Sequence, residues 1–102
     1  ADDLHEAVAI AKLHPPCIAV EPPELIGSGI SVSSANPGIV TDSVREIKKI
    51  DPKIIVLVGA GVSNAADVRK SIELGAEGVL LASAFVKSKD PEELLEEMLN
   101  AL

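Results

Sequence analysis

Short runs of hydrophobic residues alternate along the chain with longer segments in which hydrophobic residues recur every three or four positions. Three runs have the length and the Val, Ile and Leu content of β-strands, and they cover residues 17–20, 54–58 and 78–82. The run at 54–58 contains no polar residue. We therefore expect it to be buried on both faces, as in a parallel sheet that is covered by helices.

Helical periodicity and capping residues predict four helices around these strands. They extend from about Asp3 to Leu13, from Asn36 to about Ile50, from Ser63 or Asn64 to Gly75, and onward from Asp90. Asp and Asn favour the start of a helix because their side-chain oxygens accept hydrogen bonds from its free N–H groups, and glycine favours its end. Residues 22–35 show neither pattern and predict a long connection.

The predicted order is one helix followed by three strand–helix units, which is typical of a parallel sheet with right-handed crossovers. With 102 residues the chain is much shorter than the roughly 250 residues of a closed (β/α)8 barrel. It is either one small domain or a piece of something larger. We predict an α/β fold of three parallel βα units preceded by a helix, in which the second face of the sheet needs a partner; in a barrel that face is the filled interior.

The charge and composition exclude several classes of function. The net charge is −7 and Lys and Arg are not clustered, which argues against binding to nucleic acid. No hydrophobic run reaches the roughly 18 residues of a membrane span. The one cysteine, Cys17, leaves no internal disulfide, so we expect a cytoplasmic protein and a buried thiol. Neither metal-ligand spacing nor a dinucleotide fingerprint is present, so no metal or organic cofactor is expected.

Candidate chemistry lies where the strands end, because ligands of parallel α/β folds bind at the carboxyl ends of the strands. Glu21 closes the first predicted strand. It is followed by two prolines, Pro22 and Pro23, and later by the glycines at 27 and 29. A fixed carboxylate beside a loop with a stiff root and a flexible far end is how a movable lid would be built. The alternative is an ordinary charged residue leaving a strand into a loop.

The other two strand ends are suited to binding an anion. Gly59 and Gly61 follow the second strand, and Ala82 and Ser83 follow the third. Backbone N–H groups at such turns and at helix N-termini bind phosphate without a basic side chain. Because these loops contain no Lys or Arg, the amides would have to act against an unfavourable overall charge. The alternative for the Gly-x-Gly pair is a tight turn with no ligand.

The same segments resemble a known family. The run AVEPPELIGSG at 19–29, followed by Gly59-Ala60-Gly61 and by GVLLAS at 78–83, is similar to the last three βα units of triosephosphate isomerases of the archaeal type. The resemblance extends over essentially the whole chain in the same order and spacing. It implies that residues 1–102 form a single partial (β/α)8-barrel segment, the C-terminal part of a (β/α)8 TIM barrel. Ser28 stands where threonine is expected, and this change preserves the hydroxyl.

The resemblance implies a role for each candidate residue. Glu21 would be the base that moves a proton between the two carbons of dihydroxyacetone phosphate and glyceraldehyde 3-phosphate, small phosphorylated trioses. The lid would contain Pro22, Pro23, Ile26, Ser28 and Gly29. Backbone amides at Gly27, Gly59, Gly61, Ala82 and Ser83 would hold the phosphate. The family's association into homo-oligomers is expected as well.

The family's catalytic lysine and histidine lie on earlier strands, to which nothing here corresponds. His5 is expected on the first helix and His14 at the entry of a strand, so neither takes the place of the electrophile. We therefore expect activity only when the remaining barrel strands are present. Two alternatives stay open: a fragment of another phosphate-binding barrel enzyme, and a non-catalytic half-barrel that associates with another copy of the chain through its exposed interior face.

Overall fold

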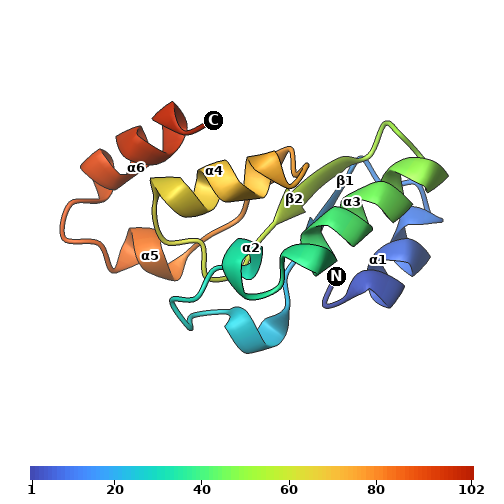
Figure 1. Ribbon diagram of the computed structural model, residues 1–102, viewed down its shortest axis with the longest axis horizontal. Coiled ribbons are helices and arrows are strands. Elements are labelled where there is room, and N and C mark those ends of the chain that lie inside the picture. The colour runs from blue at the N-terminus through green and yellow to red at the C-terminus, as the bar shows by residue number, and fades with distance from the viewer.

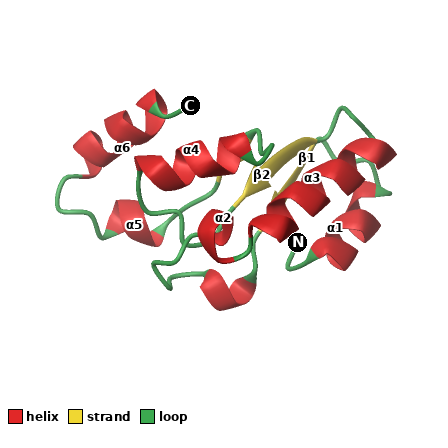
Figure 2. Cartoon of the chain, in the orientation of Figure 1, coloured by secondary structure: helices red, strands yellow, loops and turns green.

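A three-stranded parallel sheet forms the centre of the computed structural model, which describes all 102 residues (Figures 1 and 2). The strands lie in the order β1-β2-β3. Their bounds are β1 (Cys17–Val20), β2 (Ile55–Val58) and β3 (Gly78–Val79). The helical segments are α1 (Leu4–Ala11), η1 (Pro23–Leu25, a 3-10 turn), α2 (Val32–Ala35), α3 (Pro37–Ile50), α4 (Ala65–Glu73), α5 (Ser83–Val86) and α6 (Pro91–Asn100). The predicted order and the parallel direction of the strands are confirmed.

The hydrophobic core lies between the sheet and the helices on one of its faces. Alternate residues of β1 and β2 point into this layer, and they meet small and branched residues of α1 and α3. The fully or nearly fully buried members are Ala7, Ala11, Ile18, Val20, Val40, Ile47, Val56 and Val58. A second, smaller cluster packs α4 against α6 and contains Val62, Val68 and Met98. Because an apolar side chain contributes about 1.5–3 kcal/mol when it is buried, this one layer stabilises the whole arrangement.

The second strand is buried on one face only, so the prediction of burial on both faces is wrong for this chain. Val56 and Val58 face the helices, whereas Ile55 is 47% exposed and Leu57 is half-buried. Cys17, paired in register with Ile55, is also exposed, which contradicts the expectation of a buried thiol. Nothing within these 102 residues covers this face of the sheet.

The third strand is shorter than expected, because only Gly78 and Val79 of the predicted run 78–82 are β-structure. The backbone N–H of Leu80 still donates to the carbonyl oxygen of Val58, over 2.8 Å. Beyond that point the second strand has ended, so no partner remains for a longer ladder. Hydrophobicity alone does not indicate where a neighbouring strand stops.

Side-chain caps fix the helix boundaries close to their predicted positions. Asp3, Asn36, Asn64 and Asp90 each accept a hydrogen bond from a backbone N–H in the first turn. Gly75 follows α4 in the left-handed conformation, with φ at 107°. The predicted connection over 22–35 contains two single-turn segments, η1 and α2, which are too short to produce a periodic pattern. No helix in the structure is long and apolar enough to cross a membrane.

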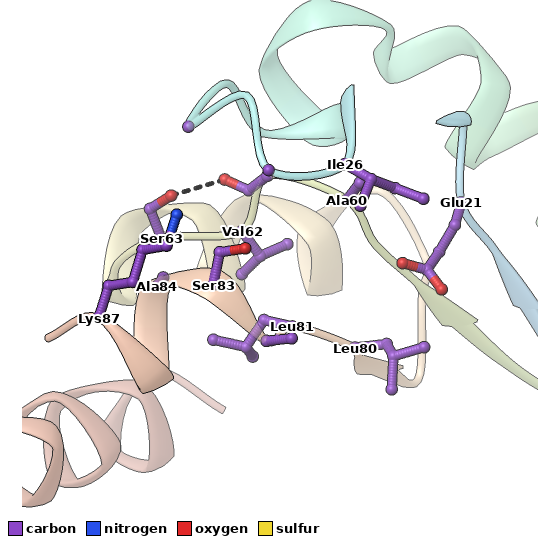
Figure 3. A pocket seen from close by; sticks show the side chains of 14 residues that line it. Glu21, Ile26, Ala60, Val62, Ser63, Leu80, Leu81, Ser83, Ala84 and Lys87 are labelled. Atoms are coloured by element: carbon purple, nitrogen blue, oxygen red, sulfur yellow. Dashed lines mark hydrogen bonds between the residues drawn. The ribbon is translucent and has the colours of Figure 1, made fainter. Parts of the chain in front are cut away.

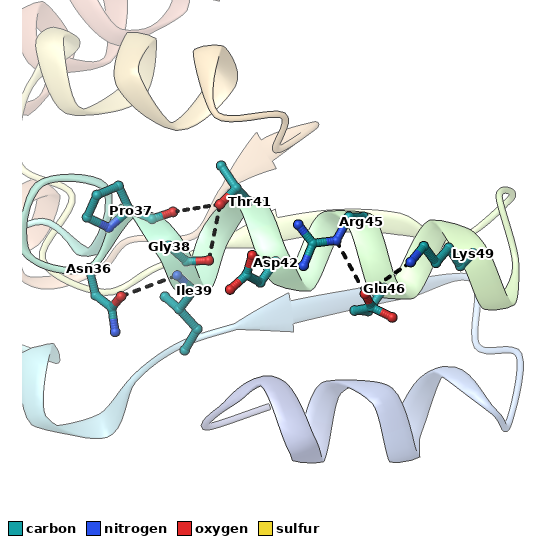
Figure 4. Close-up of polar contacts among 9 residues, drawn as sticks. All are labelled: Asn36, Pro37, Gly38, Ile39, Thr41, Asp42, Arg45, Glu46 and Lys49. Atoms are coloured by element: carbon teal, nitrogen blue, oxygen red, sulfur yellow. Dashed lines mark hydrogen bonds and ion pairs between the residues drawn. The ribbon is translucent and has the colours of Figure 1, made fainter.

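Polar contacts hold the outer surface of α3 and join it to its neighbours. Figure 4 shows Arg45 and Lys49 converging on Glu46. At the amino-terminal end of the sheet, the ammonium of Lys48 pairs with the carboxylate of Glu77, and it also donates to the carbonyl oxygen of Ile54 over 2.6 Å. The segment before β3 is thereby tied to α3.

Candidate active site

A cavity of about 500 Å³ opens at the carboxyl ends of the three strands (Figure 3). The segment that follows each strand contributes to its wall. The lining residues are Glu21, Ile26, Gly27, Gly29, Ala60, Gly61, Val62, Ser63, Leu80, Leu81, Ala82, Ser83, Ala84 and Lys87. The three segments that the sequence singled out therefore meet around one space.

The carboxylate of Glu21 stands at one end of the cavity, directly after β1. Its backbone N–H donates to the carbonyl oxygen of Ala1 over 2.8 Å, which fixes the backbone of the residue. The side chain passes over Gly59: a Cβ atom there would lie 2.9 Å from Oε2 of Glu21 and 2.7 Å from the carbonyl oxygen of Leu80. Gly59 does not line the cavity, but its lack of a side chain makes room for Glu21.

The loop after Glu21 lies over the cavity and is held mainly by its own atoms. The hydroxyl of Ser28 donates to the carbonyl oxygen of Leu25 over 2.7 Å and accepts from the N–H of Ile30 over 3.0 Å. Ile26 is 57% exposed although it lines the cavity. Gly27 and Gly29 both have positive φ, 72° and 78°. A loop with few external contacts and two left-handed glycines is well suited to move as a unit.

The far end of this loop is anchored to the loop that follows β2. The N–H of Val32 donates to the carbonyl oxygen of Ala60 over 2.9 Å. Gly61 has φ at 73°, and a Cβ atom there would overlap the carbonyl group of Ile30. Only glycine allows this approach. The far end of the loop that follows Glu21 and the loop that follows β2 are thus one packed unit.

Several backbone N–H groups around the cavity have no acceptor within the protein. They belong to Gly61 and Val62 after β2 and to Ala82 and Ser83 after β3. The N–H of Ser63, by contrast, donates to Oδ2 of Asp67 over 2.9 Å, and its hydroxyl donates to the carbonyl oxygen of Gly61 over 2.8 Å. Free amides that surround a cavity are suited to binding an anion.

The structure divides the predicted site residues into two groups. Those that line the cavity are Glu21, Ile26, Gly27, Gly29, Gly61, Ala82 and Ser83. Those that do not are Pro22, Pro23, Ser28 and Gly59. Pro22 is buried at the root of the loop that follows Glu21, Ser28 forms hydrogen bonds within this loop, and Gly59 lies beneath Glu21.

Other lining residues are absent from the sequence-based set. Leu80 and Leu81 form an apolar wall of the cavity. The sequence pattern places both of them in the third strand instead. Lys87 is the one basic residue of the lining, and Ser83 lies four positions before it. The spacing of four residues between Ser83 and Lys87 could have indicated Lys87, because residues four positions apart in a helix share a face.

Both histidines lie away from the cavity. His14 is at the opposite end of the sheet, where its Nδ1 is 3.1 Å from Oδ2 of Asp51. A hydrogen bond from the backbone N–H of Lys53, together with this contact with His14, lowers the pKa of Asp51. His5 is an exposed residue of α1. No group of three or more His, Cys, Asp or Glu side chains is placed to hold a metal ion.

Comparison with known proteins gives a consistent result over the whole chain. A family model described as Triosephosphate isomerase matches residues 1–101. The triosephosphate isomerases of Methanocaldococcus jannaschii and Methanothermus fervidus are 51% and 48% identical to it, over 96% and 99% of this chain but 45% and 46% of their own. That of Methanobrevibacter smithii is 53% identical over 92% of this chain and 42% of its own. The chain thus spans less than half the length of these curated relatives. Since the family model covers all but its last residue, the chain belongs to the triosephosphate isomerase family.

Proposed function

We propose that this chain is the part of a triosephosphate isomerase that carries the catalytic base and the phosphate site. The complete protein would interconvert dihydroxyacetone phosphate and glyceraldehyde 3-phosphate, a reaction of glycolysis and gluconeogenesis. The observation that carries the proposal is that the Glu21 carboxylate and the unpaired amides of two neighbouring loops face one cavity beneath a glycine-hinged loop.

In this proposal Glu21 takes a proton from the carbon beside the substrate carbonyl and returns it to the adjacent carbon. Its carboxylate accepts no hydrogen bond from the protein, so both oxygens remain available to the substrate. The walls beside it, Leu80 and Ile26, are apolar. Closure of the lid would remove water from the carboxylate and make it a stronger base, since a charged group is destabilised by desolvation.

The amides of Gly61, Ala82 and Ser83, which line the cavity, would hold the phosphate. Figure 3 shows Ser83 in the cavity wall apart from Glu21. Gly27 would complete the site from above, because a Cβ at this position would lie only 3.8 Å from the hydroxyl of Ser83. Glu21 and the amides would then bind opposite ends of the same small molecule. This fixes the reacting carbons relative to the base, which is a large part of catalysis in enzymes of this kind.

One component is not present in these 102 residues. Removal of the proton places negative charge on the substrate oxygen, and that charge needs a donor or cation to stabilise it. No histidine lines the cavity, and Lys87 lies at the end opposite Glu21. The chain alone is therefore expected to be inactive, and activity would require the remaining barrel strands, which bear the family's lysine and histidine.

The test is isomerisation by the chain joined to, or mixed with, a segment that supplies those strands. Glu21→Gln removes the base and is expected to lower kcat by about a hundredfold to ten-thousandfold. Glu24→Gln is the matched control, because Glu24 is an exposed residue of the same loop that does not line the cavity. It should leave kcat within about twofold of the wild type.

The outcomes separate the proposal from its alternatives. Equal loss of activity in both variants, or in neither, would contradict the role given to Glu21. Tight binding of a phosphate compound without turnover by the reconstituted protein would instead favour a non-catalytic barrel segment. Turnover of a different phosphorylated sugar would favour another enzyme of the same fold.

A further inference from the structure

The cavity carries two charged side chains, and they lie at opposite ends. Of its fourteen lining residues, Glu21 is acidic and Lys87 is basic, and the others are neutral. Figure 3 shows Glu21 beside Leu80 at one end and Lys87 extending toward Ser63 at the other. Ser83, whose amide is proposed to hold the phosphate, lies between Glu21 and Lys87 in this view. The charge of the cavity is therefore arranged along the length of the substrate.

The direction of Lys87 follows from the geometry of α5. Its backbone N–H donates to the carbonyl oxygen of Ser83 over 2.9 Å, which closes the last helical turn. Residues four positions apart share one helix face. Ser83 and Lys87 consequently face the cavity together, whereas Phe85 and Val86 are exposed and do not line it.

The ammonium of Lys87 is free to interact with a ligand. It forms no ion pair and donates no hydrogen bond, whereas Arg45, Lys48 and Lys49 on α3 are all paired with carboxylates. None of the other basic residues of the chain lines the cavity. A dianionic ligand would meet repulsion from Glu21 and from the net charge of −7, and Lys87 is the lining residue that opposes both.

We propose that Lys87 is the cationic binding residue for the phosphate end of the substrate and that it selects phosphorylated over uncharged sugars. This inference rests on the proposed function, which it extends beyond the backbone amides. Lys87 is exposed, so water and salt screen its charge. Its attraction is the same before and during the reaction, because the phosphate does not change charge. It should therefore act on KM and leave kcat unchanged.

The experiment compares Lys87→Gln with Lys89→Gln in the complete isomerase that contains this chain. Lys89 is an exposed lysine two residues away that does not line the cavity, so both variants lose the same net charge. At low ionic strength Lys87→Gln is expected to raise KM about two- to fivefold, the range of exposed charge pairs, with kcat unchanged. Lys87→Glu should raise KM further. The difference from Lys89→Gln should shrink in high salt.

Equal KM values for Lys87→Gln and Lys89→Gln, with the wild type active, would overturn the role of Lys87 and leave the proposed function intact. A wild type without isomerase activity would instead contradict the proposed function. In that case the same proteins would be titrated with inorganic phosphate, and binding would be measured from shifts of the amide NMR signals of Gly61 and Ser83. Weaker binding in Lys87→Gln alone supports the inference, and equal binding, or none, rejects it.

Discussion

Two serines show how the same residue type contributes differently to stability inside a helix. Ser43 in α3 and Ser71 in α4 are both completely buried. The hydroxyl of Ser71 donates to the carbonyl oxygen of Asp67 over 2.9 Å, whereas the hydroxyl of Ser43 has no partner. A buried hydroxyl without a partner loses its hydrogen bonds to water and gains none in return.

Ser43→Ala is therefore expected to raise the free energy of unfolding, by about 1–2 kcal/mol. Alanine removes the unpaired oxygen and also favours the helix. Ser71→Ala is the matched control, because it removes a hydroxyl that is paired and should be neutral or destabilising. Urea unfolding followed by circular dichroism measures both changes. A loss of stability in Ser43→Ala would indicate that its hydroxyl has a partner after all.

For single residues, prediction from the sequence succeeds better where the role depends on the position of the backbone. It succeeds less well where the role depends on the direction of a side chain. The positions of Glu21 and Gly61 follow from strand ends and turn glycines, and both line the cavity. Lys87 was not predicted, because its position depends on the single helical turn after the third strand, and the predicted end of that strand is wrong. Cys17 was expected to be buried, but it is exposed, because its strand lies at the face of the sheet that no element of this chain covers.

Among the elements, α3 and the segment before β3 are joined by the ion pair of Lys48 and Glu77. The hydrogen bond from Lys48 holds the pKa of Glu77 below its ordinary value of 4.5, and a hydrogen bond from the N–H of Val56 acts in the same direction. The folded state therefore binds the proton of the Glu77 carboxyl more weakly than the unfolded chain does. As a result, the ion pair stabilises the fold at pH values above 4.5. The stabilisation is lost as the pH falls through the folded-state pKa.

Glu77→Gln should accordingly flatten the fall in stability below about pH 5, while lowering stability at neutral pH. The control is Glu73→Gln, which removes an exposed carboxylate at the end of α4 that has no ion pair. Thermal unfolding midpoints measured from neutral pH down to about pH 3 provide the comparison. The role of the pair would be contradicted if Glu77→Gln and Glu73→Gln gave parallel curves.

Most elements could be predicted because each has a local signal. Asn36, Asn64 and Asp90 mark helix starts by hydrogen bonds made within one turn, so their boundaries are readable from the sequence. The end of β3 has no such signal, since it depends on where β2 stops. The single turn α2 likewise depends on a distant loop, because the N–H of Val32 donates to the carbonyl oxygen of Ala60, whereas η1 is held by local hydrogen bonds but is too short to produce a periodic pattern.

On the scale of the whole molecule, the chain is part of a (β/α)8 barrel, and one face of its sheet has no covering layer. In a complete barrel of parallel strands, side chains on this face fill the interior. Here Cys17, Ala19, Ile55 and Leu57 form a continuous apolar surface, because Cys17 pairs in register with Ile55 and Ala19 with Leu57. Exposed apolar patches of this kind favour association.

The isolated 102-residue chain is therefore expected to self-associate in a concentration-dependent manner, which sedimentation velocity would measure. Ile55→Lys places a charge at the centre of the surface and should shift the chain toward monomer. Leu13→Lys is the matched control, because Leu13 is 81% exposed but lies in the turn after α1, outside this surface. Association that persists in Ile55→Lys and disappears in Leu13→Lys would place the contact elsewhere. If the complementary strands are added, they should compete with self-association, because both processes bury the same residues.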